Sequence, residues 1–285
     1  MCKLKSAIVL KDRIFMPDYD SHSDMLNELG IEDNYLGASK KFVRVELSPV
    51  DGDVFSNIDE WKLTIDQDIR PNWFTEEEYR PKIVEAVKEW AKTHIHIGID
   101  GLIISTGQNH YIKDCKDVEV YGNATVDKVC ENATVDKVYG NATVNEVCEN
   151  ATVKWVYGNA TVKWVYGNAT VDEVYGNATV NKVCENATVD EVYENATVKW
   201  VCENATVDKV YGNATVDEVY GNATVNKVCE NATVISSCYS EWKKSQSLIL
   251  TDNATFKDNY GKTIYQSGNY KLILVKSGKT IGETL

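Results

Sequence analysis

The sequence lacks long hydrophobic runs, and this absence argues against membrane-spanning and secreted proteins. The apolar stretch nearest the N-terminus, Ala7 to Leu10, has four residues and is flanked by charged residues. A transmembrane helix needs about 20 apolar residues, and a secretory signal needs an apolar region of about 7–15. We therefore expect a cytoplasmic protein that has no membrane partner.

The usual cofactor motifs are missing as well. The chain contains no phosphate-binding glycine loop, no Cys-x-x-Cys pair and no Gly-Gly pair. A nonapeptide calcium-binding β-roll requires Gly-Gly-x-Gly-x-Asp, and structural zinc sites favour closely spaced cysteines. No motif therefore indicates a bound cofactor, and we expect none.

Histidine is scarce, and all four histidines precede residue 111. His94 and His96 alternate on one expected strand and could join nearby residues in a metal or acid–base cluster. The candidates for that cluster are Asp18, Asp20, His22 and Asp24. Because nothing in their spacing requires such a cluster, we favour ordinary surface or partly buried histidines.

What the chain has instead is a repeat. Thirteen units of nine residues follow the pattern N-A-T-V-x-x-V-[Y/C]-[G/E], with an asparagine every nine residues from Asn123 to Asn231. A unit this short cannot bury its own apolar side chains, so neighbouring units must stack into one continuous core. The pattern predicts a solenoid.

Each position of the unit has an expected role. Ala-Thr-Val alternates as in a β-strand, so Ala and both valines should point inward and the pair between the valines should face solvent. Gly-Asn is a turn pair, since both residues tolerate positive φ. Five of the eight cysteines share a position with tyrosine, which indicates free thiols in a packing slot. We favour two units per coil over three.

The motif V-Y-G-N-A-T-V resembles the V-x-G-N-A-x-V repeat of bacterial and phage left-handed β-helix proteins, with three residues added per unit. The N-terminal sequence segment F-V-R-V-E-L-S-P-V-D-G-D-V-F resembles the leader domain of uncharacterised phage or gut-bacterial repeat proteins. These resemblances imply a solenoid protein of a bacterial host but no particular activity, because such scaffolds serve as transferases, rods and inhibitors. The acyltransferases generally use a histidine in or beside the coils, and this array has none.

Composition divides the chain into three parts. Residues 1–113 predict an α+β head domain, residues 114–235 a parallel β-solenoid of nine-residue repeats, and residues 236–285 a β-rich C-terminal cap. In the head we expect a hairpin over 7–16, a helix over 21–29, strands at 42–47 and 61–65, and an amphipathic helix after Thr75. Residues 95–104 predict a second hairpin with Asp100-Gly101 as its turn. In the cap, strands are expected at 247–251 and 270–275.

The chain is acidic, with a formal net charge of −13. Residues 1–120 and 121–234 each carry −8, whereas residues 235–285 carry +3. Such a chain repels nucleic acid and anionic membranes and is attracted to basic protein surfaces. An acidic rod could imitate DNA, although we favour the simpler interpretation that the acidity keeps a β-solenoid soluble.

The variable pairs between the valines supply the candidate partner contacts. Lys-Trp replaces the other pairs in three units, and exposed aromatic side chains are enriched at protein interfaces. The candidate contact residues are Trp155, Trp164, Trp200, Asp172, Glu173, Asp190, Glu191, Asp217 and Glu218.

We predict a non-enzymatic β-solenoid scaffold or protein-binding module. The expected partner is a protein, with a basic or DNA-binding host protein as one hypothesis and oligomers through the solenoid ends as another. A phage-encoded acidic inhibitor would be the most specific form. The alternatives are an enzyme or metal site in the head, with the solenoid as spacer, and an ice-binding surface built from the threonine column.

Overall fold

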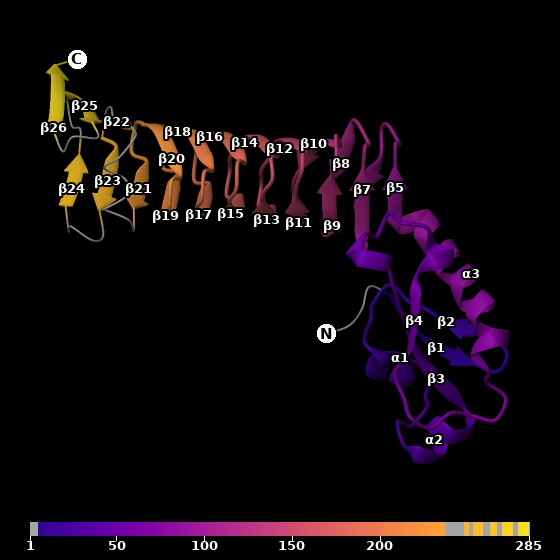
Figure 1. The fold of residues 1–285 in the computed structure, drawn as a ribbon. Coiled ribbons are helices and arrows are strands. Elements are labelled where there is room, and N and C mark those ends of the chain that lie inside the picture. Colours follow the sequence, from indigo (N-terminus) through magenta and orange to yellow (C-terminus); the bar gives the residue numbers. More distant parts are fainter. Residues whose placement is uncertain are drawn as a thin grey trace. The chain divides into compact units, whose positions relative to one another are not determined.

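The computed structural model describes residues 5–236, 248–250, 253–258, 263–266, 270–275 and 279–284. It divides the chain into two compact units, Met1–His96 and Ile97–Leu285 (Figure 1). The predicted order of a small head with helices and strands, a parallel β-solenoid and C-terminal strands is confirmed.

The first unit contains a four-stranded antiparallel sheet in the order β2-β1-β3-β4. Its strands are β1 (Lys5–Leu10), β2 (Ile14–Phe15), β3 (Phe42–Ser48) and β4 (Lys62–Ile65). The predicted hairpin is confirmed, because β1 pairs with β2 directly. Ile8 and Phe42 on one side of the sheet form a core with Met25 and Leu26 of the first helix.

Three helices complete this unit: α1 (His22–Glu28), α2 (Tyr35–Lys40) and α3 (Glu76–His94). Two single-turn 3-10 helices, η1 (Val50–Gly52) and η2 (Ile58–Glu60), lie between β3 and β4. The predicted helix starts are confirmed, since Ser21 caps α1 and Thr75 caps α3 through side-chain oxygens that accept a backbone N–H. Helix α2 was not predicted, because this six-residue helix buries only Gly37 and so has no amphipathic stripe.

The second unit contains two sheets of parallel strands, continued at their C-terminal ends by antiparallel strands. The odd sheet consists of β5 (Ile95–Ile97), β7 (His110–Lys113), β9 (Thr125–Cys130), β11 (Thr143–Val147), β13 (Thr161–Val165), β15 (Thr179–Val183), β17 (Thr197–Val201), β19 (Thr215–Val219), β21 (Thr233–Ser236), β23 (Thr255–Asp258) and β24 (Thr263–Gln266). The even sheet consists of β6 (Ile103–Ile104), β8 (Val118–Val120), β10 (Thr134–Val138), β12 (Thr152–Val156), β14 (Thr170–Val174), β16 (Thr188–Val192), β18 (Thr206–Val210), β20 (Thr224–Val228), β22 (Leu248–Leu250), β25 (Tyr270–Val275) and β26 (Lys279–Thr284).

Each coil of the array contains one strand of each sheet, so two repeat units make one coil. Val162 of β13 pairs with Val144 of β11 and with Val180 of β15, which are its counterparts two units before and two units after it. The even sheet keeps the same register, with Val171 paired to Val153 and Val189. The prediction of two units per coil is confirmed.

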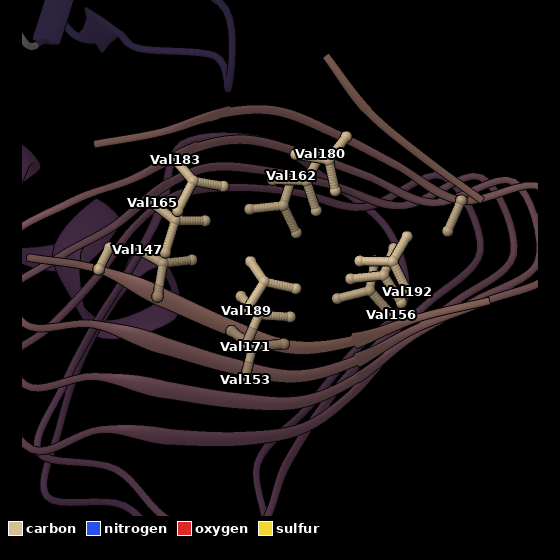
Figure 2. Packing of buried hydrophobic residues seen from close by; sticks show 14 of the residues in the cluster. Val147, Val153, Val156, Val162, Val165, Val171, Val180, Val183, Val189 and Val192 are labelled. Atoms are coloured by element: carbon tan, nitrogen blue, oxygen red, sulfur yellow. The ribbon is translucent and has the colours of Figure 1, made fainter. Parts of the chain in front are cut away.

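Alanine and both valines of every unit fill the space between the two sheets. Figure 2 shows valines of both sheets converging on a common core, and Val162, Val171 and Ala178 are fully buried. The two residues between the valines lie on the outer surface of the solenoid. The regular alternation of inward and outward side chains is interrupted at this point, so that two successive side chains face solvent. In β12 and β14, for example, the ladder pairs Val153 with Val171 and Trp155 with Glu173 and passes over the residue between them. The predicted inward and outward positions are confirmed.

The turns depart from the sequence prediction in one respect. Positive φ occurs at the Gly or Glu of the unit, as in Gly176 (φ 70) and Glu194 (φ 58), and the repeat asparagines do not adopt it. Asparagine amides instead bond to the asparagine of the preceding coil, as Asn159 does to Asn141 at 3.3 Å. A non-glycine residue at positive φ is strained. The glutamates offset this strain with a hydrogen bond, because Glu194 Oε2 accepts the backbone N–H of Gly176 at 3.0 Å.

The boundary between head and solenoid lies earlier than predicted. The two compact units meet at His96 rather than at residue 113, and β5 and β6 belong to different sheets instead of forming a hairpin about Asp100-Gly101. These first coils lack the N-A-T-V pattern, so the sequence does not mark them as part of the array.

The predicted strands of the C-terminal region are confirmed where the structure describes them. β22 and β23 continue the two parallel sheets, and β24, β25 and β26 extend them in antiparallel pairing.

We predict that the glutamate bonds at the turns stabilise the stacking of coils. Glu194→Ala should remove the acceptor of the Gly176 N–H, at a cost of about 1 kcal/mol, so that this amide exchanges hydrogen about fivefold faster. Glu194→Gln keeps an acceptor oxygen and serves as the control. Equal exchange at Gly176 in both variants would contradict a stabilising role for this bond.

Candidate functional site

The outward pairs form columns, because each residue lies beside its counterpart in the next coil. The structure divides the nine predicted contact residues between two opposite faces of the solenoid. Trp155, Asp172, Glu173, Asp190 and Glu191 lie on the even sheet, whereas Trp164, Trp200, Asp217 and Glu218 lie on the odd sheet. The predicted set therefore forms two surfaces rather than one.

The odd sheet carries a surface that is both aromatic and basic, which we call the tryptophan face. It consists of Lys163, Trp164, Lys182, Lys199 and Trp200 on β13, β15 and β17. The outward pair positions of these three strands contain no carboxylate, since the remaining one is Asn181. This part of an acidic chain is therefore locally cationic.

Both indoles of the tryptophan face are solvent-exposed, with Trp164 52% and Trp200 45% accessible. Lys182 lies between them, and its Nζ is 5.7 Å from the centre of the Trp164 ring. Trp200 Nε1 donates to Glu218 at 3.1 Å, which orients its ring. These residues and Tyr220 line an open groove of about 470 Å³. The groove offers a contact partner two apolar walls with a cation between them.

The even sheet carries the opposite charge on a surface that we call the aspartate face. It consists of Asp172, Glu173, Asp190, Glu191 and Asp208 on β14, β16 and β18. Burial is the main cause that raises the pKa of Asp172, and Lys154 opposes the shift. Burial also raises the pKa of Asp190, followed by repulsion from Asp172 and Asp208. The column thus holds like charges one strand apart.

Several charges on the even sheet are paired within the chain. Lys154 lies 2.7 Å from Asp136, and Lys137 lies 2.6 Å from Glu119. Glu191 accepts from Tyr211 at 2.8 Å and lies 3.6 Å from Lys209. The central aspartates differ, because no hydrogen bond or ion pair joins Asp190 to another residue in the described part of the chain.

The two edges of the solenoid differ from one another, and this difference was not predicted. One edge stacks six tyrosines with ring centres 4.9–5.1 Å apart: Tyr121, Tyr139, Tyr157, Tyr175, Tyr193 and Tyr211. The other edge follows the order Cys130, Cys148, Tyr166, Cys184, Cys202 and Tyr220. The signal was present, since tyrosine recurs without exception in every second unit from Tyr121 to Tyr211. The described repeat cysteines are buried thiols, as their role in packing predicts.

The residues of the alternative histidine–aspartate cluster in the head divide between separate contacts. His94 Nε2 lies 3.2 Å from Asp18, as the hypothesis allowed. Asp20, however, binds the buried Lys5 at 2.9 Å, and His22 Nδ1 lies 3.5 Å from Asp66, a residue that the hypothesis did not include. Sequence spacing could not reveal this, because Asp66 follows β4 and reaches α1 only through the folding of the sheet.

The aspartate column gives a pH-dependent prediction. Because the folded-state pKa of Asp190 is raised, its ionised form costs stability above that pKa, and the cost disappears below the unfolded-state pKa of about 3.9. Asp190→Asn should therefore raise the free energy of unfolding at neutral pH by less than about 1 kcal/mol, since the side chain is partly exposed and screened by solvent.

The gain from Asp190→Asn should shrink in high salt and vanish near pH 3, which is below the unfolded-state value. Thr188→Ala, on the same strand, is the control. A gain at pH 3 equal to that at neutral pH would show that the ionised form of Asp190 is not its cause.

Among the residues that the structure describes, no helix is both long and apolar enough to span a bilayer. Comparisons with protein-family models, curated proteins and solved structures found no match for the chain.

Proposed function

We propose that the solenoid is a non-enzymatic protein-binding scaffold, and that the partner its faces fit is a second copy of this chain. In this arrangement the tryptophan face of one copy docks on the aspartate face of the next. The observation that carries the proposal is that each face holds charges without a partner in the described part of the chain, and that the two faces have opposite sign.

The lack of internal partners is found on both faces. Within the described residues, Lys163 and Lys199 form no hydrogen bond or ion pair, and the same is true of Asp190. Lysines and aspartates of neighbouring strands elsewhere in the array do pair, as Lys154 and Asp136 show at 2.7 Å. Side chains at these positions are therefore able to reach an opposite charge on a neighbouring strand. An opposite charge on a binding partner would pair with Lys163, Lys199 and Asp190.

The spacing between charged residues is the same on both faces, because the strands of both sheets come from the same repeat. Lys163, Lys182 and Lys199 occupy three successive strands of the odd sheet, and three aspartates occupy three successive strands of the even sheet. Neighbouring strands lie about 4.8 Å apart in either sheet. Lys163 and Lys199 lie two strands apart in one outward column, as Asp172 and Asp208 do, whereas Lys182 lies in the column of the tryptophans. A rigid face-to-face contact can thus align two ion pairs at once, with Lys182 beside them.

The tryptophans add the apolar part of the contact. Buried aromatic side chains provide much of the binding energy at protein interfaces, particularly where charged pairs surround them. Trp164 and Trp200 are held by strands with a fixed register, so that little conformational entropy is lost when they are covered.

The expected association is weak and open-ended. A face of three strands, each about 16 Å long, offers about 230 Å² per copy, so both partners together bury about 460 Å², which is less than half the lower limit of about 1,000 Å² for a stable interface. Contact between unlike faces does not close on itself and can add further copies. The net charge of −13 opposes association, so the local match must outweigh an overall repulsion.

The other hypotheses remain predictions. The acidic-inhibitor hypothesis would use the aspartate face against a basic host protein, but its carboxylates are limited to three strands and are bordered by Lys154 and Lys209. The ice-binding hypothesis relies on threonine columns, which are single on each sheet and run beside charged pairs.

Charge reversal provides a direct test of the pairing. Reversing the tryptophan face by Lys163→Glu, Lys182→Glu and Lys199→Glu should give a monomer, because both faces are then acidic. Reversing the aspartate face by Asp172→Lys, Asp190→Lys and Asp208→Lys should also give a monomer, because both faces are then basic. An equimolar mixture of the two should associate again, as measured by sedimentation velocity at low salt.

The mixture also controls for misfolding, since two misfolded variants would not restore specific association. High salt should weaken the association of the wild-type chain and of the mixture alike. A wild-type chain that stays monomeric at low salt, or a mixture that does not associate, would overturn the pairing. If capture of a different protein then depended on Trp164 and Trp200, the scaffold role would stand with another partner.

The tryptophans can be tested separately. Trp164→Ala and Trp200→Ala together should weaken self-association by about tenfold or more, since truncation of a central interface tryptophan costs about 2 kcal/mol or more. Tyr35→Ala is the control, because Tyr35 is an exposed aromatic residue of the first unit, 70% accessible, and belongs to neither face. An equal loss in both variants would show that the tryptophan face is not the contact.

A further inference from the structure

A group of three ionisable side chains in the first unit lies outside the surfaces described above. His22 begins α1, Glu46 lies in β3, and Asp66 follows β4. One ligand atom of each residue lies within 4.8 Å of the others. The sheet order places β3 beside β4, and contacts between α1 and the sheet bring the histidine to the same place.

The hydrogen bonding of His22 leaves one ring nitrogen available. His22 Nε2 lies 3.1 Å from the carbonyl oxygen of Val45, and a carbonyl oxygen can only accept. Nε2 therefore carries the hydrogen, and in the neutral ring Nδ1 holds the lone pair. Nδ1 is also the atom that faces Asp66, at 3.5 Å. A metal-binding histidine typically donates its second ring N–H to a carbonyl or carboxylate in this way.

Glu46 is an unusual buried carboxylate. It is only 9% exposed, and no hydrogen bond or ion pair joins its side chain to any other residue that the structure describes. Burial of an unpaired charge is costly, so a carboxylate in such a position normally has a cation or a donor nearby.

A second polar atom beside Glu46 is also left without a partner. Ser6 lies directly across from Glu46 in the pairing of β1 with β3. Its hydroxyl oxygen is buried and has no hydrogen-bond partner within the described structure. A buried hydroxyl without a partner is uncommon in native proteins, and its position beside the Glu46 carboxylate points to a bound group that would satisfy it.

We propose that His22 Nδ1, Glu46 and Asp66 bind a divalent cation of the zinc or manganese class. One imidazole nitrogen and two carboxylates are a ligand set that such cations accept, whereas calcium and magnesium favour oxygen ligands alone. The cation takes the position that a proton on Nδ1 would otherwise occupy. Water or the Ser6 hydroxyl completes the coordination.

The chain offers a built-in comparison at a second histidine–carboxylate pair. His94 lies 3.2 Å from Asp18, and Asp18 and Asp66 have nearly the same exposure, at 63% and 61%. The other described group with metal-binding atoms, Cys184, Cys202 and Glu203, is less suited, because burial raises the pKa of Cys184 to about 11 and disfavours the thiolate.

The test is a calorimetric titration of the full chain with Zn²⁺ near neutral pH. Asp66→Asn should weaken one binding component by about tenfold or more, because it removes one of three protein ligands, whereas Asp18→Asn should leave that component unchanged. Glu46→Gln should abolish the same component and, without metal, should raise the melting temperature by removing a buried charge. Any binding of Zn²⁺ by cysteines is the same in all of these variants, so it does not contribute to the differences between their isotherms.

Nitrogen NMR of the His22 ring supplies a readout that does not depend on affinity. Zn²⁺ should shift the Nδ1 resonance and leave Nε2 protonated, and Asp66→Asn should reduce this shift at equal metal concentration. The proposal would be overturned by identical isotherms in the wild-type chain, Asp66→Asn and Glu46→Gln. An Nδ1 resonance that Zn²⁺ leaves unchanged would also overturn it.

Discussion

The in-register hydrogen bonding of each coil to the one before it is the interaction on which the rest of the solenoid depends. The backbone bonds continue through strand and turn alike: Thr143 N donates to Ala124 O, Asn141 N to Gly122 O and Tyr139 N to Val120 O, each at 2.9 Å. A shift of one residue would move valines out of the core and bring one residue of each outward pair into it. The register therefore fixes the core, the edges and both faces together.

A fixed register converts each repeat position into a column, and the chemistry of the residue decides whether the column stabilises the fold. Valine columns exclude water, asparagine columns bond amide to amide, and tyrosine columns stack their rings 5.0 Å apart between Tyr157 and Tyr175. Aspartate columns have no such benefit, since Asp172, Asp190 and Asp208 place like charges on neighbouring strands. A natural repeat could alternate their sign, as Asp136 and Lys154 do, so the unrelieved column favours an external role.

The sequence allowed the inward and outward positions to be predicted, because burial repeats with the same period as the letters. The sequence did not reveal which residues share one face, because that depends on which repeat units become neighbours in the solenoid. Trp164, Lys182 and Trp200 belong to alternate units, and only a coil of two units places them on one face. The same holds for the head, where Glu46 of β3 and Asp66 after β4 approach His22 through sheet pairing. The coils before residue 114 were missed because Ile103 of β6 and Tyr111 of β7 belong to no repeat unit.

The pairing of cysteine with a following glutamate in the repeat is not a requirement of the fold. Tyr193 precedes Glu194, which has a φ of 58 and bonds to Gly176 N as the glutamates after cysteine bond to theirs. Tyrosine is thus compatible with glutamate at the turn, and neither backbone geometry nor capping demands cysteine before it. Duplication of blocks of units explains the coupling better than selection for thiol chemistry does. By the same reasoning, departures from the duplicated pattern in the outward pairs carry more information about function than the repeat itself. The Lys-Trp pairs are such a departure, because they place cations and exposed indoles on a rod that is otherwise acidic.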